Sequence, residues 1–271
     1  MNKVALITGS TRGIGKALSI GLAKKGYNIV VTGKTTDTSS TLPGTIYSVA
    51  NEVEKEGVKA LSIILDVRDE ASVIDMYTKI KNKFNRLDII INNAGALYWK
   101  PIEETSMKRY DLINDINCRG SFMVSKYGAP LMLETGGGHI ITMSPPLAQD
   151  ITQLKIMRDK TAYMISKWGM TMGAMGFSEE YRKRGIGVST LWPMTAIESY
   201  AVINNNLGNK TTWRTPEIMV DAVNNIVEEN PYTFTGHQLI DEAYLRKKGI
   251  SDFSKYQCVK GYEPPSLMSS L

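Results

Sequence analysis

Hydrophobic runs and amphipathic helical patterns alternate along nearly the whole chain. Seven short apolar runs bounded by turn residues predict strands; they cover residues 4–8, 28–32, 60–65, 89–92, 139–143, 187–192 and 234–240. The segments between them have helical periodicity and include residues 13–25, 46–55, 70–84, 108–134, 161–184 and 216–228. Strand and helix in regular alternation predict right-handed crossovers and a parallel sheet covered on both faces. We therefore expect an α/β fold, with one Rossmann-type, doubly wound parallel sheet of about seven strands flanked by helices.

Residues 195–215, between the sixth predicted strand and the next helix, show neither a strand nor a helix pattern. In open parallel sheets, ligands bind beyond the carboxyl ends of the strands, and this stretch leaves the sheet at that edge. We expect it to be a substrate lid. No composition break or internal repeat marks a second domain, so we expect a single domain over residues 1–271, with a C-terminal tail after about residue 245.

The composition is that of an ordinary globular protein, with 42% hydrophobic and 22% charged residues in a chain of 271. No run approaches the ~18 apolar residues of a membrane span, and the first predicted strand begins too early to leave room for a signal peptide. We therefore expect a cytoplasmic protein. The residues Ser269-Ser270-Leu271 are a weak match to a peroxisomal signal, because Ser270 stands where that signal has a basic residue.

The cysteines, histidines and charges exclude several classes of function. Cys118 and Cys258 are far apart in the chain, which argues for a reducing compartment without disulfides. His139 and His237 belong to no group with ligand spacing, so a catalytic metal is not expected. The net charge of +5 is mild, and basic runs such as 182–184 are typical of solvated helix ends rather than of nucleic-acid sites.

A glycine-rich turn links the first predicted strand to the first predicted helix. It reads Thr8-Gly9-Ser10-Thr11-Arg12-Gly13-Ile14-Gly15. A helix that begins there presents free N–H groups and the positive end of its dipole, which together bind a pyrophosphate. Gly9 permits the tight turn, Gly13 lets the backbone approach the phosphates, and Gly15 lets the helix pack on the strand. An ordinary βα turn is the alternative, but the flanking strand and helix favour a nucleotide site.

Tyr163 and Lys167 lie four residues apart within a predicted helix, so both side chains share one face. A phenol with its ordinary pKa of about 10 is a poor proton shuttle at neutral pH. A neighbouring ammonium favours the phenolate and lowers that pKa, and an oxidised nicotinamide ring would reinforce the effect. An exposed helix pair without function is the alternative.

Three motifs, in this order along the chain, resemble those of the short-chain dehydrogenase/reductase family. They are the spacing G-x-x-x-G-x-G, then Asn92-Asn93-Ala94-Gly95 after the fourth predicted strand, and then the pair Tyr163 and Lys167. The resemblance implies hydride transfer to or from a nicotinamide cofactor, with Tyr163 as acid/base and Lys167 also on the cofactor ribose. It further implies that Ser10, Thr11, Arg12 and Ile14 of the turn bind the cofactor. Asp66 and Val67 would lie beside adenine, and Asn93, Ala94 and Gly95 beside the adenine ribose. Asn117 would hold a relay water, and Pro193 would lie beside the nicotinamide amide.

The end of the second predicted strand, Thr32-Gly33-Lys34, bears on the choice of cofactor. Members that prefer NAD place an acidic residue there to hold the ribose 2′-hydroxyl, whereas here no carboxylate follows until Asp37. Lys34 and Arg12 would instead meet a 2′-phosphate with two positive charges. We therefore expect NADP(H) to be preferred, with NAD(H) as the alternative.

One position departs from the family pattern. The family's catalytic serine, which holds the carbonyl oxygen, aligns with Pro145, and Ser144 stands one place early. A proline offers no hydroxyl and no N–H, and losing one such donor commonly lowers the rate about 10²- to 10³-fold. Three alternatives follow. Ser144 serves as the catalytic hydrogen-bond donor, or a residue within 149–161 supplies the missing hydroxyl. In the third alternative, the chain is a catalytically weak NADP(H)-binding protein that acts as a redox sensor or interaction module.

Stretches around residues 144–147, 191–197 and 234–242 resemble the hydroxysteroid dehydrogenase-like protein 2 subgroup. Members can carry a sterol-carrier domain after the dehydrogenase, and from the length of this sequence we expect none here. Several aromatic and methionine residues lie near the expected pocket: Tyr98, Trp99, Trp192, Met194 and Trp213. They favour an apolar, lipid-derived carbonyl or alcohol as substrate. The alternative is that these side chains only pack the lid. The family implies a homodimer or homotetramer, and the methionine-rich face within 164–175 is typical of core or subunit contact.

Overall fold

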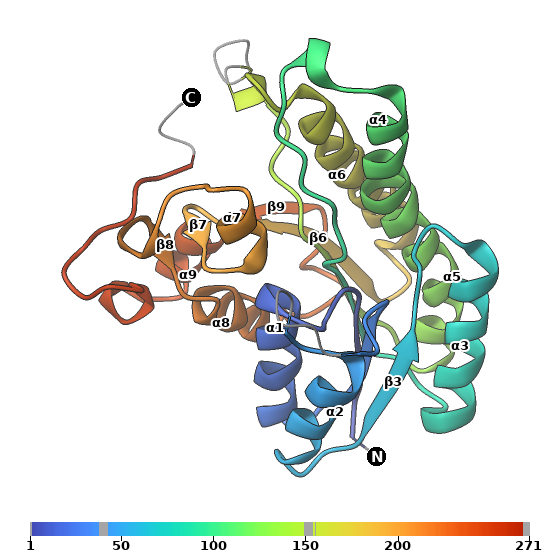
Figure 1. Ribbon diagram of the computed structural model, residues 1–271. Helices are drawn as coiled ribbons and strands as arrows, with labels where there is room; N and C mark the ends of the chain where they lie inside the picture. Colours follow the sequence, from blue (N-terminus) through green and yellow to red (C-terminus); the bar gives the residue numbers. More distant parts are fainter. Residues whose placement is uncertain (1, 38–42, 149–153, 155, 268–271) are drawn as a thin grey trace.

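The computed structural model describes residues 2–37, 43–148, 154 and 156–267 (Figure 1). Seven strands form one sheet in the order β3-β2-β1-β4-β5-β6-β9, and every neighbouring pair is parallel. The strands are β1 (Val4–Ile7), β2 (Asn28–Gly33), β3 (Ala60–Ile64), β4 (Ile89–Asn92), β5 (Gly138–Thr142), β6 (Ile186–Trp192) and β9 (His237–Ile240). This sheet confirms the predicted Rossmann-type fold class. The strand order reverses between β1 and β4, and ligands of such sheets bind at that point beyond the carboxyl ends of the strands.

Helices cover both faces of the sheet. They are α1 (Gly13–Lys24), α2 (Ile46–Glu54), α3 (Glu70–Phe84), α4 (Met107–Asn114), α5 (Gly120–Glu134), α6 (Thr161–Tyr181), α7 (Tyr200–Asn204), α8 (Glu217–Ile226) and α9 (Asp241–Lys247). On one face α1 packs against α2 and α8, whereas on the other α3 packs against α5, and α4 against α6. Figure 1 shows these two helical layers on opposite sides of the strands.

The core consists of two apolar layers, one on each face of the sheet. In β1, Ala5 and Ile7 belong to the layer under α1, α2 and α8, whereas Val4 and Leu6 belong to the layer under α3 and α5. Successive side chains of a strand point to opposite faces. Because both faces are covered, all four of these side chains are fully buried, and the predicted strands are continuous apolar runs.

The helix predicted over residues 108–134 is interrupted. A π-helical turn, Asp115–Arg119, joins α4 to α5. In such a turn each backbone hydrogen bond spans one residue more than in an α-helix, and the turns are frequent at functional sites. Asn117, a predicted relay residue, lies within it. Helical periodicity gives no sign of this extra residue, which is why the sequence predicted one continuous helix.

The predicted lid, residues 195–215, has structure of its own. β7 (Ala196–Ile197) and β8 (Trp213–Arg214) pair in parallel as a separate two-stranded sheet, and α7 lies between them in the chain. These elements stand beside the main sheet, at the left of Figure 1. Strands of two residues have no detectable period, so the sequence pattern could not assign them.

The boundary predicted near residue 245 falls inside α9, which ends at Lys247. Beyond α9, Phe253 and Tyr256 are buried in the same apolar layer as residues of α1 and α8. This part of the chain therefore packs onto the core instead of trailing from it. The weak peroxisomal match at residues 269–271 lies outside the described residues.

Candidate active site

The glycine turn between β1 and α1 has the geometry that a pyrophosphate site needs. Gly9 and Gly13 have φ angles of 66° and 53°, in the left-handed region that side chains disfavour. A Cβ on Gly9 would lie 2.9 Å from Ala94 Cα, and a Cβ on Gly15 would lie 2.4 Å from Gly9 O. α1 has no side-chain cap, so the N–H groups of its first turn remain available to an anion.

Asn93 ties the end of β4 to the glycine turn. Its Nδ2 donates to Thr8 O at 2.9 Å and to Gly9 O at 3.0 Å. Thr8 Oγ1 in turn accepts from the backbone N–H groups of Asn93 and Ala94, each at 3.0 Å. These bonds hold the two turns together at the point where the strand order reverses.

Two basic side chains lie near the carboxyl end of β2. Lys34 Nζ is 3.4 Å from Asp66 Oδ2, and the lysine side chain is 63% exposed. Arg12 Nη2 donates to Thr35 Oγ1 at 2.8 Å and to Gly44 O at 3.4 Å, whereas its buried Nε has no partner among the described residues. Both Lys34 and Arg12 line the same cavity as the glycine turn. Positive charge is therefore present on the wall where the sequence predicts binding of the ribose 2′ substituent.

Asp66 and Val67, the predicted adenine contacts, also line this cavity. Arg68 Nη2 lies 2.6 Å from Asp66 Oδ2. Hydrogen bonds from Arg68 hold the pKa of the Asp66 carboxyl well below its usual range. Asp66 is therefore charged and already paired, while Val67 adds an apolar surface beside it.

Asn117 connects the segment after β4 to α6. Its Oδ1 accepts from Ala96 N at 2.8 Å, and its Nδ2 donates to Ala96 O at 3.1 Å and to Ser166 Oγ at 2.9 Å. Ser166 immediately precedes Lys167. The Asn117 side chain is fully buried and does not line the cavity, so it acts on the site by positioning α6.

Tyr163 and Lys167 lie one turn apart in α6, and both line the cavity. Lys167 Nζ donates to Met143 O at 2.8 Å and lies 5.9 Å from the centre of the Tyr163 ring. Burial lowers the pKa of Lys167 to about 8 and raises the pKa of Tyr163 well above its ordinary value. Burial therefore acts against the predicted lowering of the Tyr163 pKa, which was expected from the Lys167 ammonium together with an oxidised nicotinamide ring.

Ser144 lies just after β5, but its hydroxyl faces α6. The side chain is fully buried, and its Oγ accepts a hydrogen bond from Thr171 Oγ1 at 2.8 Å. The same threonine hydroxyl lies 2.7 Å from Pro145 O. Ser144 would have to leave Thr171 to hold a carbonyl oxygen, so this geometry opposes its predicted catalytic role. Of the stretch predicted to supply a replacement donor, residues 149–153 and 155 lie outside the described residues.

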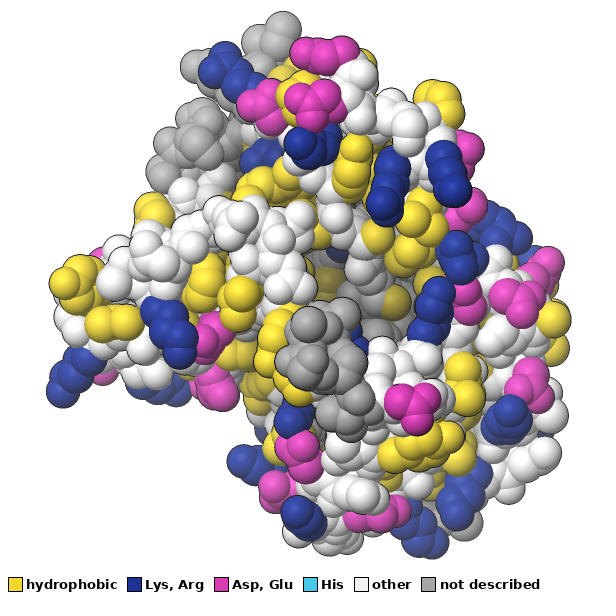
Figure 2. Space-filling model, viewed as in Figure 1, with side chains coloured by type: hydrophobic (Ala, Val, Ile, Leu, Met, Phe, Trp, Pro, Cys, Tyr) yellow, Lys and Arg dark blue, Asp and Glu magenta, His cyan; other side chains and the backbone are white. Residues whose placement is uncertain are grey.

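One cavity of about 770 Å³ joins the glycine turn to Tyr163 and Lys167. Figure 2 shows this face of the molecule hollowed near its middle, with hydrophobic side chains around the hollow. The predicted site residues that line the cavity are Gly9, Arg12, Gly13, Ile14, Gly15, Lys34, Asp66, Val67, Asn93, Ala94, Gly95, Tyr163, Lys167 and Pro193. The predicted residues that do not line it are Ser10, Thr11, Asn117 and Ser144. All four of these are buried behind its wall.

The wall beside Tyr163 is aromatic. Trp99 and Trp192 line the cavity and pack in one apolar cluster with Tyr163, whose ring centre is 6.4 Å from that of Trp99. The indole nitrogens of both tryptophans are buried, and neither has a hydrogen-bond partner among the described residues. The other residues predicted near the pocket do not line it; they are Tyr98, Met194 and Trp213.

Two parts of the cavity wall contain residues that the sequence analysis did not name as site residues. Several residues in and around α7 line it, which makes the lid part of the site: Ser199, Tyr200, Ala201, Val202, Asn204, Asn205 and Leu207. Leu267 lines it as well. The position of the lid was predicted from the sheet edge, whereas nothing in the sequence around Leu267 indicates a site residue.

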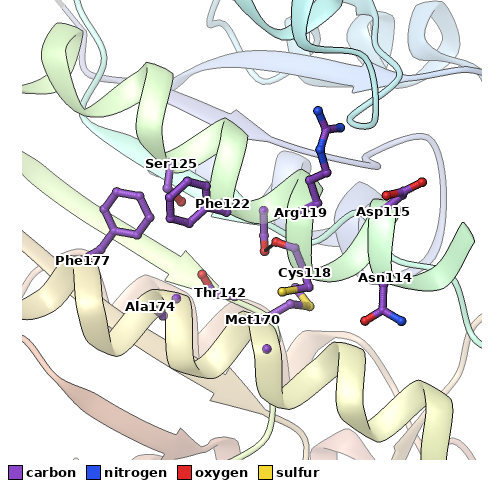
Figure 3. Close-up of a pocket in the computed structure, with 13 residues that line it drawn as sticks. Asn114, Asp115, Cys118, Arg119, Phe122, Ser125, Thr142, Met170, Ala174 and Phe177 are labelled. Atoms are coloured by element: carbon purple, nitrogen blue, oxygen red, sulfur yellow. Dashed lines mark hydrogen bonds between the residues drawn. The ribbon is translucent and has the colours of Figure 1, made fainter. Parts of the chain in front are cut away.

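A second cavity, of about 270 Å³, lies between the π-helical turn, α5 and α6. Figure 3 shows Phe122 and Phe177 on facing helices at one end of it, with Cys118 and Met170 toward the other. The ring centres of Phe122 and Phe177 are 5.3 Å apart. Phe122 is 51% exposed and Met172 of α6 is 60% exposed, so this cavity opens on an apolar surface.

No group of three His, Cys, Asp or Glu side chains with the spacing of a metal site occurs among the residues that the structure describes. Within the same part of the chain, no helix is long and apolar enough to cross a membrane. Cys118 and Cys258 are both free thiols.

A family model described as short chain dehydrogenase matches residues 3–204. Among curated relatives, hydroxysteroid dehydrogenase-like protein 2 of Danio rerio is 42% identical over 259 residues, which cover 94% of this chain. The match spans only 61% of the length of that relative. Among solved structures, a short-chain dehydrogenase from Mycobacterium thermoresistibile is 38% identical, with a TM-score of 0.89 and coverage of 97% of this chain and 93% of that one. A Xanthomonas campestris protein is 32% identical, with a TM-score of 0.91 and coverage of 97% and 95%.

Proposed function

The chain belongs to the short-chain dehydrogenase family, as its motifs predicted, and we propose that it is an NADP(H)-dependent oxidoreductase. The reaction interconverts an apolar, lipid-derived carbonyl compound and its alcohol by hydride transfer. One observation carries the proposal: the same cavity is lined by the glycine turn and by Tyr163 and Lys167. A phosphate site and an acid/base group therefore face one space.

The residues present fit a dinucleotide. The φ angle of Gly9 and the closeness of Ala94 leave room for a backbone turn but not for a side chain. We assign the pyrophosphate to the N–H groups at the start of α1. We assign the 2′-phosphate to Lys34 and Arg12, because both side chains line this wall and bring positive charge to it. NAD(H) is the alternative, because its ribose lacks only that phosphate.

The remaining cofactor contacts follow the family pattern. Asp66 and Val67 would hold adenine, and Pro193 would contact the nicotinamide amide. Asn93, Ala94 and Gly95 would lie beside the adenine ribose, where Asn93 already fixes the turn. These residues, apart from Lys34 and Arg12, do not distinguish NADP(H) from NAD(H).

The bound nicotinamide would supply or accept the hydride at its 4-position. In the reducing direction, Tyr163 donates its phenolic proton to the carbonyl oxygen, and in the oxidising direction it accepts a proton from the alcohol. Burial by itself favours the neutral, proton-donating form of this phenol. The oxidising direction requires the phenolate, which the ammonium of Lys167 and the positive ring of bound NADP⁺ would favour. Lys167, anchored on Met143 O, presents its ammonium beside Tyr163 and binds the ribose. Asn117 holds Ser166, the neighbour of Lys167; the family pattern also assigns to it a relay water.

The substrate end of the cavity is apolar. Trp99 and Trp192 flank Tyr163, and Val202 and Leu207 add apolar lid surface. Burial of an alkyl or ring system against these side chains contributes about 25 cal/mol per Å² of apolar surface. A carbonyl compound with a sizeable hydrocarbon part therefore fits this wall better than a small polar one. The alternative of lid packing applies to Trp213, which is buried and donates from Nε1 to Leu207 O.

We further propose that a second copy of the chain covers the exposed face of α5 and α6, as the family implies. Phe122 and Met172 present apolar surface there. Gly176 has no neighbouring atom within 4 Å of where a Cβ would lie, so a partner helix can approach closely. Light scattering after gel filtration should show a dimer or tetramer, and Phe122→Glu should shift it toward monomer. Ile102→Glu, at a site 70% exposed and remote from α6 in the chain, is the control.

Single-turnover hydride transfer tests the enzymatic function. The protein is mixed with limiting NADPH and a panel of aliphatic and aromatic ketones, and the loss of NADPH absorbance is followed. We expect transfer to at least one apolar ketone. Tight NADPH binding with no transfer to any member of the panel would favour the alternative of a catalytically weak binding protein, in which Pro145 has left the site without its donor.

A further inference from the structure

After α9 the chain returns along the lid, and residues 256–267 are called the return segment below. Gln257 forms an antiparallel bridge with Arg214 of β8. The Arg214 side chain, which is only 1% exposed, donates from Nη2 to Glu263 Oε1 at 2.6 Å. The return segment is therefore attached to the lid both through its backbone and through a charged pair.

The end of the return segment lies against the turn that follows β6. Ser266 forms an antiparallel bridge with Thr195, and Leu267 N donates to Met194 O at 2.7 Å. On its other side, Met194 N donates to Asp241 Oδ1 at 2.7 Å. Both polar backbone groups of Met194 are thus held, one by α9 and the other by the return segment.

Leu267 lines the cavity that contains Tyr163 and Lys167. Trp192 and Pro193, the two residues before Met194, line it as well. The hydrogen bond to Met194 therefore places the Leu267 backbone beside the wall that carries Trp192, and the leucine side chain is half-buried there. An aliphatic side chain fixed at this wall sets how much space an apolar ligand has.

We propose that Leu267 determines which carbonyl compounds the cavity accepts, and that the return segment completes the wall of the substrate site. This inference rests on the proposed function. The family model ends its match at residue 204. Leu267 thus comes from a part of the chain that the shared family pattern does not describe, whereas Tyr163 and Lys167 come from the part that it does. Selectivity and proton transfer are carried by separate segments.

Binding of a homologous series of methyl ketones tests this role. The probes are 2-butanone, 2-octanone and 2-dodecanone, titrated by calorimetry into the full chain saturated with NADP⁺, so that no turnover is needed. The variants are Leu267→Ala, which enlarges the space, and Leu267→Trp, which reduces it. Tyr262→Ala is the matched control, because Tyr262 belongs to the return segment but is 56% exposed and does not line the cavity.

The quantity compared is the ratio of the Kd for 2-butanone to the Kd for 2-dodecanone. We expect Leu267→Ala to raise this ratio about tenfold relative to the natural chain, and Leu267→Trp to lower it. A few methylenes in an apolar pocket change binding by about that factor. The Kd for NADP⁺ should change by no more than about twofold in the Leu267 variants. Tyr262→Ala should change the ratio of the ketone Kd values by no more than about twofold. Ratios unchanged in both Leu267 variants, an equal shift in Tyr262→Ala, or no ketone binding at all would overturn the inference. If the proposed oxidoreductase function is wrong, the single-turnover experiment will show no hydride transfer, which is a separate result from the ketone Kd values.

Discussion

Asp241 Oδ1 accepts a hydrogen bond from Met194 N at 2.7 Å, which joins the first residue of α9 to the turn after β6. Asp241 is fully buried, and its Oδ2 has no partner among the described residues. Burial raises the pKa of Asp241 to about 6 from its ordinary value of 3.8. The folded protein therefore binds this proton more tightly than the unfolded chain does.

The first prediction concerns pH and stability. Because the pKa of Asp241 is raised on folding, its contribution to stability is complete below about pH 4 and is lost as pH rises to about 6, a change of about 3 kcal/mol. Asp241→Asn keeps an acceptor for Met194 N and carries no charge. It should therefore be more stable than the natural chain at pH 7 by up to about that amount, and no more stable at pH 4.

Urea unfolding at the two pH values measures this difference. Asp111→Asn, at an exposed position on α4, is the control for removal of a carboxylate and should not change the pH dependence. An Asp241→Asn variant that loses stability equally at both pH values would show that Asp241 acts through its hydrogen bonds alone.

The second prediction concerns the cofactor. Lys34→Ala and Arg12→Ala should each weaken NADPH binding about tenfold and leave NADH binding nearly unchanged, because a charge-assisted bond to the 2′-phosphate is lost. Fluorescence titration of both cofactors measures the two Kd values. Lys59→Ala, which removes an exposed lysine before β3, is the control. If the natural chain binds NADPH and NADH equally well, the NADP(H) preference is wrong.

The third prediction separates chemistry from folding at Tyr163. Tyr163→Phe removes only a hydroxyl, so turnover should disappear while the Kd for NADPH and the melting temperature stay the same. Tyr181→Phe makes the same change at the other end of α6, where the ring stacks on Phe177, and should keep full activity. Turnover that survives in Tyr163→Phe would remove this residue from the mechanism.

The fourth prediction follows from the bond between Ser144 and Thr171. Ser144→Ala should lower the melting temperature by about 2–4 °C, since a buried hydrogen bond contributes about 1 kcal/mol. It should leave kcat within about tenfold, because the hydroxyl does not reach the cavity. Thr171→Val removes the same bond from the other side and should have a similar effect. A loss in kcat of about 10²-fold or more in Ser144→Ala alone, with unchanged NADPH affinity, would instead identify Ser144 as the carbonyl donor.

The sequence by itself determined the sheet, the glycine turn and the helix face of Tyr163 and Lys167. These features depend on residues that are close together in the chain. A strand buried on both faces needs a continuous apolar run, a left-handed turn needs glycine, and a spacing of four residues brings two side chains onto one helix face. Each signal is complete within a short stretch of residues, so it can be seen without the rest of the molecule.

Only the tertiary structure decided what lies between these elements in space. No local pattern indicates that the Ser144 hydroxyl faces Thr171, that β7 pairs with β8, or that Leu267 lines the cavity. The burial that raises the pKa of Tyr163 likewise comes from residues distant in the chain, such as Trp99 and Trp192. Contacts of this kind join segments tens of residues apart, and they are set by how the packed layers fit together rather than by any local pattern.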